Sequence, residues 1–332
     1  MNLKETRPIL YITIIITSIV LYPGWSCAND SATEVTPTGL HFKREDHVSI
    51  EREELCISLE KVEVSYEFKN GSNKDIVTEM AFPIPDYEYS FSELTPSFDD
   101  FAVEVNGKAI PYNTEARALL KEKNYTKTLE KMNISISDFG QFDPTEENSF
   151  FAQLTEKNQR ELVSLGLVRE DGWPLWTVSK KFYWSQTFPA NSSVIIKHHY
   201  TPYIGFRPFG LKSLKSDNDM QLQAVEKDRH FLERDACVDK DTMTTLEKYD
   251  RPREEGLVWG AWVSYILTTA NNWKQPIKSF HLIIEKNEHD LMSLCFAHTL
   301  AKTGPNRYEV EVKNFVPTSN LKVYFFKDSK SS

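Results

Sequence analysis

The sequence lacks the short motifs that mark common catalytic and nucleotide-binding sites. It has no Gly-x-Ser-x-Gly turn to expose a nucleophilic serine, no glycine-rich phosphate loop and no His-Glu-x-x-His pair for zinc. It also has no Cys-x-x-Cys pair, and only four cysteines among 332 residues. Because catalytic groups can assemble from distant residues, these absences argue against an enzyme without excluding one. We therefore predict no catalytic, cofactor-binding or metal-binding residues.

Basic residues are outnumbered as well. The chain has 39 Lys and Arg against 48 Asp and Glu, which gives a formal net charge of −9. An acidic chain is a poor partner for nucleic acid or anionic lipid. The hydrophobic content of 40% is ample for a packed core, so the composition predicts a globular protein that binds no nucleic acid.

A long apolar run occurs only near the N-terminus, where residues 1–28 have the form of a signal peptide. Lys4 and Arg7 precede an apolar stretch from Ile9 to Leu21, and Ser26-Cys27-Ala28 offers small residues for cleavage after Ala28. This stretch is too short to cross a bilayer comfortably. We expect export to the periplasm or the exterior, with no transmembrane segment after cleavage. The alternatives are an uncleaved anchor and a lipoprotein acylated at Cys27.

Export would bring the remaining cysteines into an oxidising compartment, where two of them are expected to pair. Cys56, Cys237 and Cys295 allow three pairings. Cys56 opens an apolar strand and is typical of a buried small hydrophobe. We favour a structural disulfide between Cys237 and Cys295.

Alternating β-branched and aromatic residues predict strands along most of the chain. The densest pattern, Phe182 to Tyr203, is expected to form a central β-hairpin that turns at residues 189–193. One face of its first strand would carry Phe182, Trp184, Gln186 and Phe188, and one face of its second strand would carry Val194, Ile196, His198 and Tyr200. Asn106-Gly107 is the residue pair that a tight hairpin turn requires. A strand from Val62 to Phe68 is expected to turn and return as far as Phe82, and five more strands are expected between Trp259 and Phe325.

Two adjacent histidines, His198 and His199, lie within the second strand of the central pair. Neighbouring residues of a strand point to opposite faces, so these two side chains cannot hold one metal ion together. We expect one of them to pack inward with a hydrogen bond.

Helical spacing interrupts the strands between residues 113 and 170. Thr114 and Thr155 are expected to cap short helices there, and Asp239 is expected to cap another in a charged region farther along. The sequence thus predicts a mainly β, β-sandwich-like fold, α+β overall, with two β-rich domains. These parts are an N-terminal domain (29–204) with a helical insertion (113–170), a connecting region (205–257) and a C-terminal domain (258–332). The insertion either covers the sheet or forms a lid over a ligand.

Several of these segments together resemble the exported bacterial proteins grouped as domain of unknown function 4424 (DUF4424). The resemblance covers nearly all of the chain after residue 28. It rests on the segments Val62–Asn70, Ala81–Pro85, Phe182–Tyr203, Tyr265–Leu267, Ala270–Trp273 and Lys302–Pro305. It implies export and a β-rich fold, and it supports the pairing of Cys237 with Cys295. It implies no established activity and therefore no functional residues.

These observations favour an exported, soluble, non-catalytic protein of the bacterial envelope or secretome. Its partner would be an unidentified protein or an envelope or host ligand, and it would need no cofactor. The alternative is an extracytoplasmic hydrolase that acts on envelope or host polymers, with its site near the insertion at 113–170. The hydrolase requires a cleft that holds titratable residues with shifted pKa values.

Overall fold

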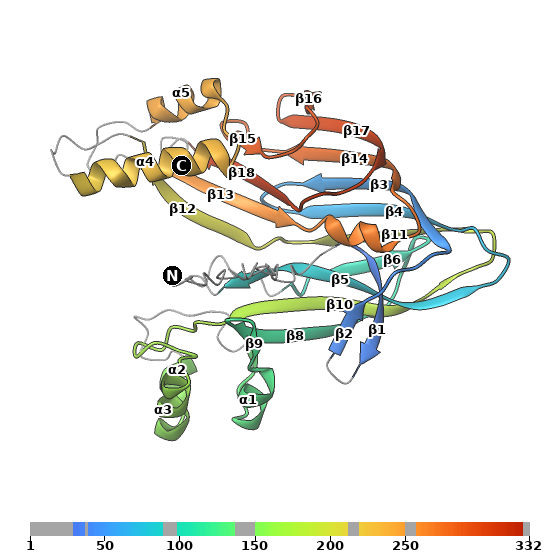
Figure 1. Cartoon of the computed structure of the whole chain (residues 1–332), viewed down its shortest axis with the longest axis horizontal. Coiled ribbons are helices and arrows are strands. Elements are labelled where there is room, and N and C mark those ends of the chain that lie inside the picture. Colours follow the sequence, from blue (N-terminus) through green and yellow to red (C-terminus); the bar gives the residue numbers. More distant parts are fainter. Residues whose placement is uncertain are drawn as a thin grey trace, which may run out of the picture.

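The computed structural model describes residues 29–36, 39–88, 98–136, 150–211, 219–249 and 257–327. The signal peptide expected at residues 1–28 lies outside these ranges. The described chain is mainly β, with strands in three sheets and a few helices, which confirms the predicted mainly β, α+β class (Figure 1). None of the described helices combines the length and the hydropathy needed to cross a membrane.

The first sheet has six strands. Their spatial order is β2 (Gly39–Phe42), β1 (Ser31–Thr36), β5 (Ile76–Glu88), β10 (Thr177–Phe188), β8 (Asn113–Leu120) and β9 (Lys123–Asn124). Each neighbouring pair in this sheet is antiparallel. The helices α1 (Thr126–Lys131), α2 (Phe150–Gln153) and α3 (Glu156–Ser164) follow β9 in the chain and lie on the lower side of Figure 1.

The second sheet has eight strands. Their spatial order is β16 (Ala301–Lys302), β17 (Arg307–Phe315), β14 (Ile277–Glu285), β3 (Val48–Ile57), β4 (Val62–Asn70), β11 (Ser193–Tyr200), β6 (Ala102–Val105) and β7 (Lys108–Ala109). The pair β14–β3 is parallel, and it joins strands from the two ends of the chain. The partition into two domains at residues 205–257 stays a prediction. The sheet itself combines strands from both sides of that region.

The third sheet has four strands and carries two helices. Its spatial order is β12 (Ile204–Gly210), β13 (Leu257–Tyr265), β18 (Leu321–Lys327) and β15 (Leu291–Leu294). The helices α4 (Asp219–Arg234) and α5 (Lys240–Tyr249) lie next to this sheet (Figure 1). They bury Leu232 and Leu246 against Phe209 and Tyr324 in a small core of their own. Asp239 caps α5 as expected, because its carboxylate accepts from the backbone N–H of Thr242 at 2.7 Å.

The central segment from Phe182 to Tyr203 forms two strands, but these strands do not pair with each other. β10 pairs with β5 and β8 in the first sheet, whereas β11 pairs with β4 and β6 in the second. The expected hairpin is therefore wrong, although the expected inward faces are correct. Trp184 of β10 packs on His198 of β11 with 5.3 Å between ring centroids, so the two strands meet face to face across the core.

A second crossover lies beside this one. β4 belongs to the second sheet and β5 to the first, so the return after Val62–Phe68 is also a change of sheet rather than a hairpin. The buried side chain of Asn70 joins the two crossovers. Its Nδ2 donates to the carbonyl oxygens of Phe188 at 2.9 Å and Lys74 at 2.7 Å, and its Oδ1 accepts from the N–H of Ser72 at 2.8 Å.

Three other local predictions can be scored, and two of them are confirmed. The Asn106-Gly107 hairpin is confirmed: Val105 pairs with Lys108, and both turn residues have positive φ, 50° and 76°. The helix expected from Thr114 is wrong, because residues 113–120 form β8. The spacing of apolar residues there suits a helix, but the free edge of β10 takes the segment as a partner strand along Thr177–Tyr183. The predicted cap at Thr155 is confirmed, since its side chain accepts from the N–H of Asn158 at the start of α3.

Candidate functional site

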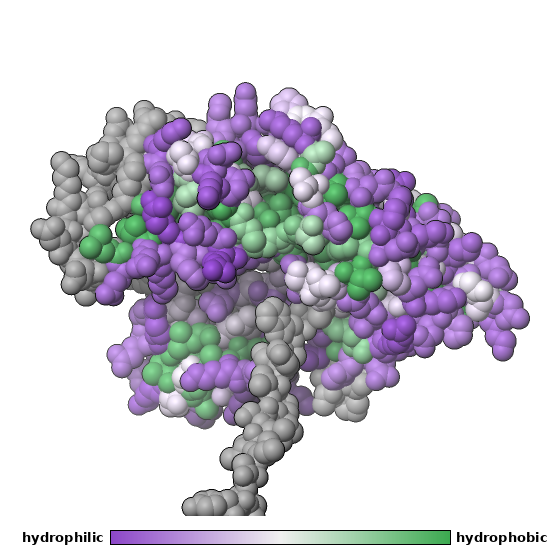
Figure 2. All heavy atoms as spheres, turned by 45° about the horizontal axis from the view of Figure 1, so that its top comes forward, coloured by the Kyte–Doolittle hydropathy of each residue, from purple (hydrophilic) through white to green (hydrophobic). Residues whose placement is uncertain are grey.

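A cleft of about 1150 Å³ lies between α5 and the segment that runs from β15 to β17. One wall comes from Thr242 and Tyr249 of α5, and the other from β15, Lys302 and Tyr308. Figure 2 looks toward the top of Figure 1, where these elements lie, and shows a band of hydrophobic residues bordered by hydrophilic ones. The cleft is therefore a large, open hollow with both apolar and charged groups around it.

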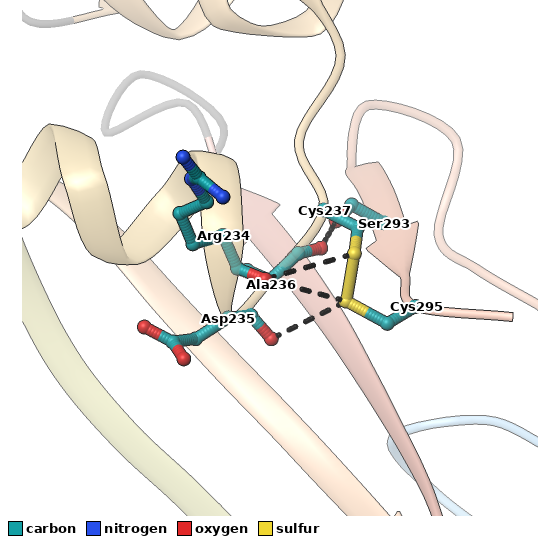
Figure 3. Close-up of a disulfide and its surroundings, with 6 residues drawn as sticks. All are labelled: Arg234, Asp235, Ala236, Cys237, Ser293 and Cys295. Carbon is teal, nitrogen blue, oxygen red and sulfur yellow. Dashed lines mark hydrogen bonds between the residues drawn. A yellow bond between two sulfur atoms is a disulfide. The ribbon is translucent and has the colours of Figure 1, made fainter.

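A disulfide joins the two walls. Cys237 follows α4 and precedes α5, while Cys295 follows β15, and their sulfur atoms are 2.00 Å apart (Figure 3). Around the bond, Ser293 donates to the carbonyl oxygen of Ala236, and Cys295 Sγ contacts the carbonyl oxygen of Asp235 at 3.5 Å. The sequence allows three pairings of Cys56, Cys237 and Cys295, and the structure contains the favoured one, Cys237 with Cys295. The bond fixes the start of α5 relative to β15.

Two titratable side chains of the cleft have shifted pKa values. Asp290 is 4% exposed, and its burial raises the pKa of the carboxyl group above the usual range. One of its carboxylate oxygens has no hydrogen-bond partner among the described residues. Desolvation lowers the pKa of Lys286, whose ammonium group donates to the carbonyl oxygens of Asn287 at 3.1 Å and Glu288 at 3.3 Å. Asp290 is thus a buried acid in the wall of the cleft, whereas the neighbouring Glu288 is exposed and can accept a hydrogen bond from a ligand.

Aromatic and basic groups line the rest of the cleft. Phe296 meets His298 edge-on with 5.4 Å between ring centroids, and the Lys302 ammonium lies 5.9 Å from the centre of the Tyr308 ring. Aromatic rings supply flat apolar surfaces, and their neighbours supply hydrogen-bonding groups. This combination suits a ligand that has apolar faces as well as polar groups.

A second, smaller cavity of about 300 Å³ opens where the three sheets meet. It is lined by Tyr87 of β5, Tyr200 of β11 and Trp262 of β13, together with Tyr203 and Lys322. Tyr87 and Tyr203 stack with 5.5 Å between centroids. Burial raises the pKa of Tyr87 to about 12, so its hydroxyl stays protonated at physiological pH.

A cluster of polar side chains is buried in the core between the sheets. Its members are Asn29, Asp30, Glu53, Tyr66, His198, Tyr265 and Thr269, and none is more than 2% exposed. His198 Nε2 lies 2.8 Å from Asp30 Oδ2, and Asn29 Nδ2 donates to Glu53 Oε2 at 3.0 Å. The hydroxyl groups of Tyr66 and Tyr265 are hydrogen-bonded at 2.8 Å. We call this set the buried polar cluster.

Burial shifts the acid groups of the buried polar cluster toward their neutral forms. Burial, together with the nearby Asp30, raises the pKa of Glu53 to about 8 against the opposing hydrogen bond from Asn29. Burial also raises the pKa of Asp30, against the opposing influence of His198. Because these groups are sealed from solvent, a substrate cannot reach them, and the cluster is not an active site.

The sequence-based expectations for histidine and cysteine can now be compared with the structure. His198 packs inward with a hydrogen bond, as expected for one of the two histidines. Cys56 is partly buried, and burial raises the pKa of its thiol to about 11, so the thiol is protonated and unreactive at neutral pH. Over the described ranges, no group of three His, Cys, Asp or Glu residues could hold a metal ion.

The sequence analysis did not identify the buried acids of the cleft and of the buried polar cluster. Glu53 occupies the same alternating face of β3 as the buried Leu55 and Ile57, and this phase could have marked it as inward-facing. Asp290 has no such signal, because it lies in the connection before β15, outside any strand whose alternation could mark its side chain as buried. The helices of the 113–170 insertion do not line the cleft between α5 and β15–β17.

Comparison with known proteins gives one family match. The family model described as Domain of unknown function (DUF4424) matches residues 28–324. No curated protein matches the chain.

Several solved structures are distantly similar. One is a protein of Legionella pneumophila subsp. pneumophila str. Philadelphia 1, provisionally described as a nutrient binding protein. It is 13% identical with a TM-score of 0.39, and the match covers 90% of this chain and 71% of that one. Yeast LTA4 hydrolase in complex with bestatin is 9% identical with a TM-score of 0.29, over 85% of this chain and 29% of that one. An M1 zinc metallopeptidase of Deinococcus radiodurans is 7% identical with a TM-score of 0.28, over 85% and 43%. At these TM-scores the likenesses assign no activity to this chain.

Proposed function

Since the chain belongs to the family described as Domain of unknown function (DUF4424), which brings no activity with it, we propose a function from the cleft itself: a binding protein without catalytic activity. Its ligand is a small polar molecule that carries hydrogen-bond donors as well as apolar faces. We further propose that the protein is exported after cleavage of residues 1–28 and works in the bacterial envelope or outside the cell.

The observation that carries the proposal is the disulfide across the cleft. A hollow of about 1150 Å³ is large enough for a ligand, and Cys237–Cys295 holds its two walls at a fixed distance. A preformed site avoids the cost of ordering the protein when the ligand binds. The exposed carboxylate of Glu288 gives the ligand an acceptor, and the rings of Phe296 and Tyr308 give it apolar surfaces.

Native mass spectrometry of the protein purified from its own cells tests the proposal. We expect added mass that remains after gentle ionisation and is lost in the Glu288→Gln variant, which keeps the shape but removes the charge of an exposed side chain that lines the cleft. Asp241→Asn is the matched control, because Asp241 is exposed on α5 and does not line the cleft. Added mass that both variants retain equally would show that the ligand binds elsewhere and would contradict the assignment of this cleft.

A hydrolase acting on envelope or host polymers is the second candidate. The observation that favours it is the shift of the pKa of Asp290 and of Lys286 within one cleft. Incubation with isolated envelope polymers separates the two functions. A binding protein returns its ligand unchanged, whereas a hydrolase releases fragments at a rate that Asp290→Asn abolishes.

A further inference from the structure

Residues 29–31 are held inside the protein, although they directly follow the segment expected to be removed. Asn29, Asp30 and Ser31 are each 0% exposed. The backbone N–H of Asn29 donates to Thr269 Oγ1, and Thr269 Oγ1 donates back to the Asn29 carbonyl at 2.8 Å. Trp273 Nε1 donates to the Asp30 carbonyl at 2.7 Å, and Asn272 Nδ2 donates to Ser31 Oγ at 2.9 Å. Each of the three residues is thus fixed by the segment around η3 (Thr268–Asn272).

The charges around this segment are not balanced. Asp30 has a basic partner in His198, at 2.8 Å, whereas among the described residues Glu53 is hydrogen-bonded only by the side-chain amide of Asn29. No cationic side chain in the described ranges forms an ion pair with Glu53. A fully buried carboxylate normally requires a cation or several donors. In addition, Asp30 Oδ1 is buried without a hydrogen-bond partner among the described residues.

We propose that the missing cation is the α-ammonium group of Asn29, created by cleavage after Ala28, and that Glu53 is the counter-ion built to receive it. A peptidase of the export machinery would hydrolyse the Ala28–Asn29 peptide bond. Water supplies the hydroxyl group of the new Ala28 carboxyl group and a proton to the Asn29 nitrogen. The carboxyl group then releases its proton to solvent and the amine takes one up, so that the products are a carboxylate and an ammonium. The inference rests on the cleavage proposed above and is independent of the cleft.

The geometry suits this role. The α-nitrogen and Nδ2 of one asparagine are separated by a single short side chain, and Nδ2 already lies 3.0 Å from Glu53 Oε2. The α-nitrogen keeps Thr269 Oγ1 as an acceptor and, as an ammonium, gains two protons that it can direct toward Glu53, which already binds the side chain of the same residue. With the ammonium present, Glu53 and Asp30 each have a basic partner. Processing would therefore stabilise the folded state, in addition to releasing the chain from its leader.

A double-mutant cycle tests the charge pairing. Two chains are compared at pH 7, one beginning at Asn29 with a free amine and one carrying Ala28 ahead of it, each with and without Glu53→Gln. We expect the Asn29 chain to unfold several degrees higher than the Ala28 chain. Glu53→Gln should lower the melting temperature of the Asn29 chain and leave that of the Ala28 chain unchanged or higher. Equal melting temperatures, or a difference that persists fully in Glu53→Gln, would overturn the proposal.

A second measurement needs no variant. An amine-reactive reagent applied to the native Asn29 chain should leave the α-amine unmodified while it modifies exposed lysines such as Lys108. After denaturation the α-amine should react fully. An α-amine that reacts as fast as Lys108 in the native protein would contradict its burial. A mature chain from the natural cell that begins at a residue other than Asn29 would overturn the proposal as well.

Discussion

Asn70→Ala is expected to destabilise the protein through the junction of the two sheet crossovers. The Asn70 side chain is buried and makes three hydrogen bonds, two as donor to Phe188 and Lys74 and one as acceptor from Ser72. At about 1 kcal/mol net for each bond, the substitution should lower the free energy of unfolding by about 3 kcal/mol. Urea denaturation followed by tryptophan fluorescence measures the loss.

Two further variants test whether the hydrogen bonds of Asn70 cause this loss of stability. Asn70→Asp keeps the acceptor for Ser72 but replaces the donor with a charged group that faces two carbonyl oxygens, so it should be at least as damaging as Asn70→Ala. Asn73→Ala is the control, because Asn73 is exposed in the same connection, and it should change the stability by less than about 0.5 kcal/mol. If Asn70→Ala also costs less than about 1 kcal/mol, the side chain does not hold the crossovers together and the reasoning fails.

Two further predictions concern the disulfide and the buried polar cluster. Replacing both Cys237 and Cys295 by serine should reduce the free energy of unfolding by about 4 kcal/mol, because the disulfide closes a loop with a sequence separation of 58. Chemical denaturation measures this loss, and finding no loss would contradict the prediction. In a chain that keeps Ala28, the stability should fall as the pH rises from about 5 to 8, because folded Glu53, whose pKa is about 8, stays protonated while unfolded Glu53 does not. The free energy of unfolding should fall by a total on the order of 5 kcal/mol, and the raised pKa of Asp30 adds to this fall with the same sign. Urea denaturation at each pH measures the profile, and Glu53→Gln should flatten it.

The strands could largely be predicted from the sequence, whereas their partners could not. Alternation identified the buried faces of Phe182–Phe188 and Val194–Tyr200, because side chains alternate along any strand. A hairpin and a crossover between packed sheets produce the same alternation, so the pattern does not say whether two strands meet edge to edge or face to face. The pairing depends on β4 and β5, which cross between the sheets at the same place.

The disulfide is the one part of the candidate site that could be predicted from the sequence. Cys237 and Cys295 were favoured from the sequence, but the cleft beside them forms from segments that carry no recognisable motif. The partnership of Glu53 with Asn29 was also hidden. Glu53 has a strand phase that points inward, yet nothing in the residues around it indicates that a segment before the first strand would fill the core.

The parallel pairing of β14 with β3 has a consequence for the order in which the protein folds. It brings together residues that are 227 positions apart, such as Glu51 and Lys278. While the chain is synthesised or emerges from a membrane pore, β3 can pair with β4 early, but its other edge has to wait for almost the whole chain. An open edge of this kind invites pairing with other molecules, and contacts between distant residues slow folding. A chain that ends before residue 277 should therefore aggregate, and the complete chain should benefit from a chaperone that covers β3 until β14 arrives.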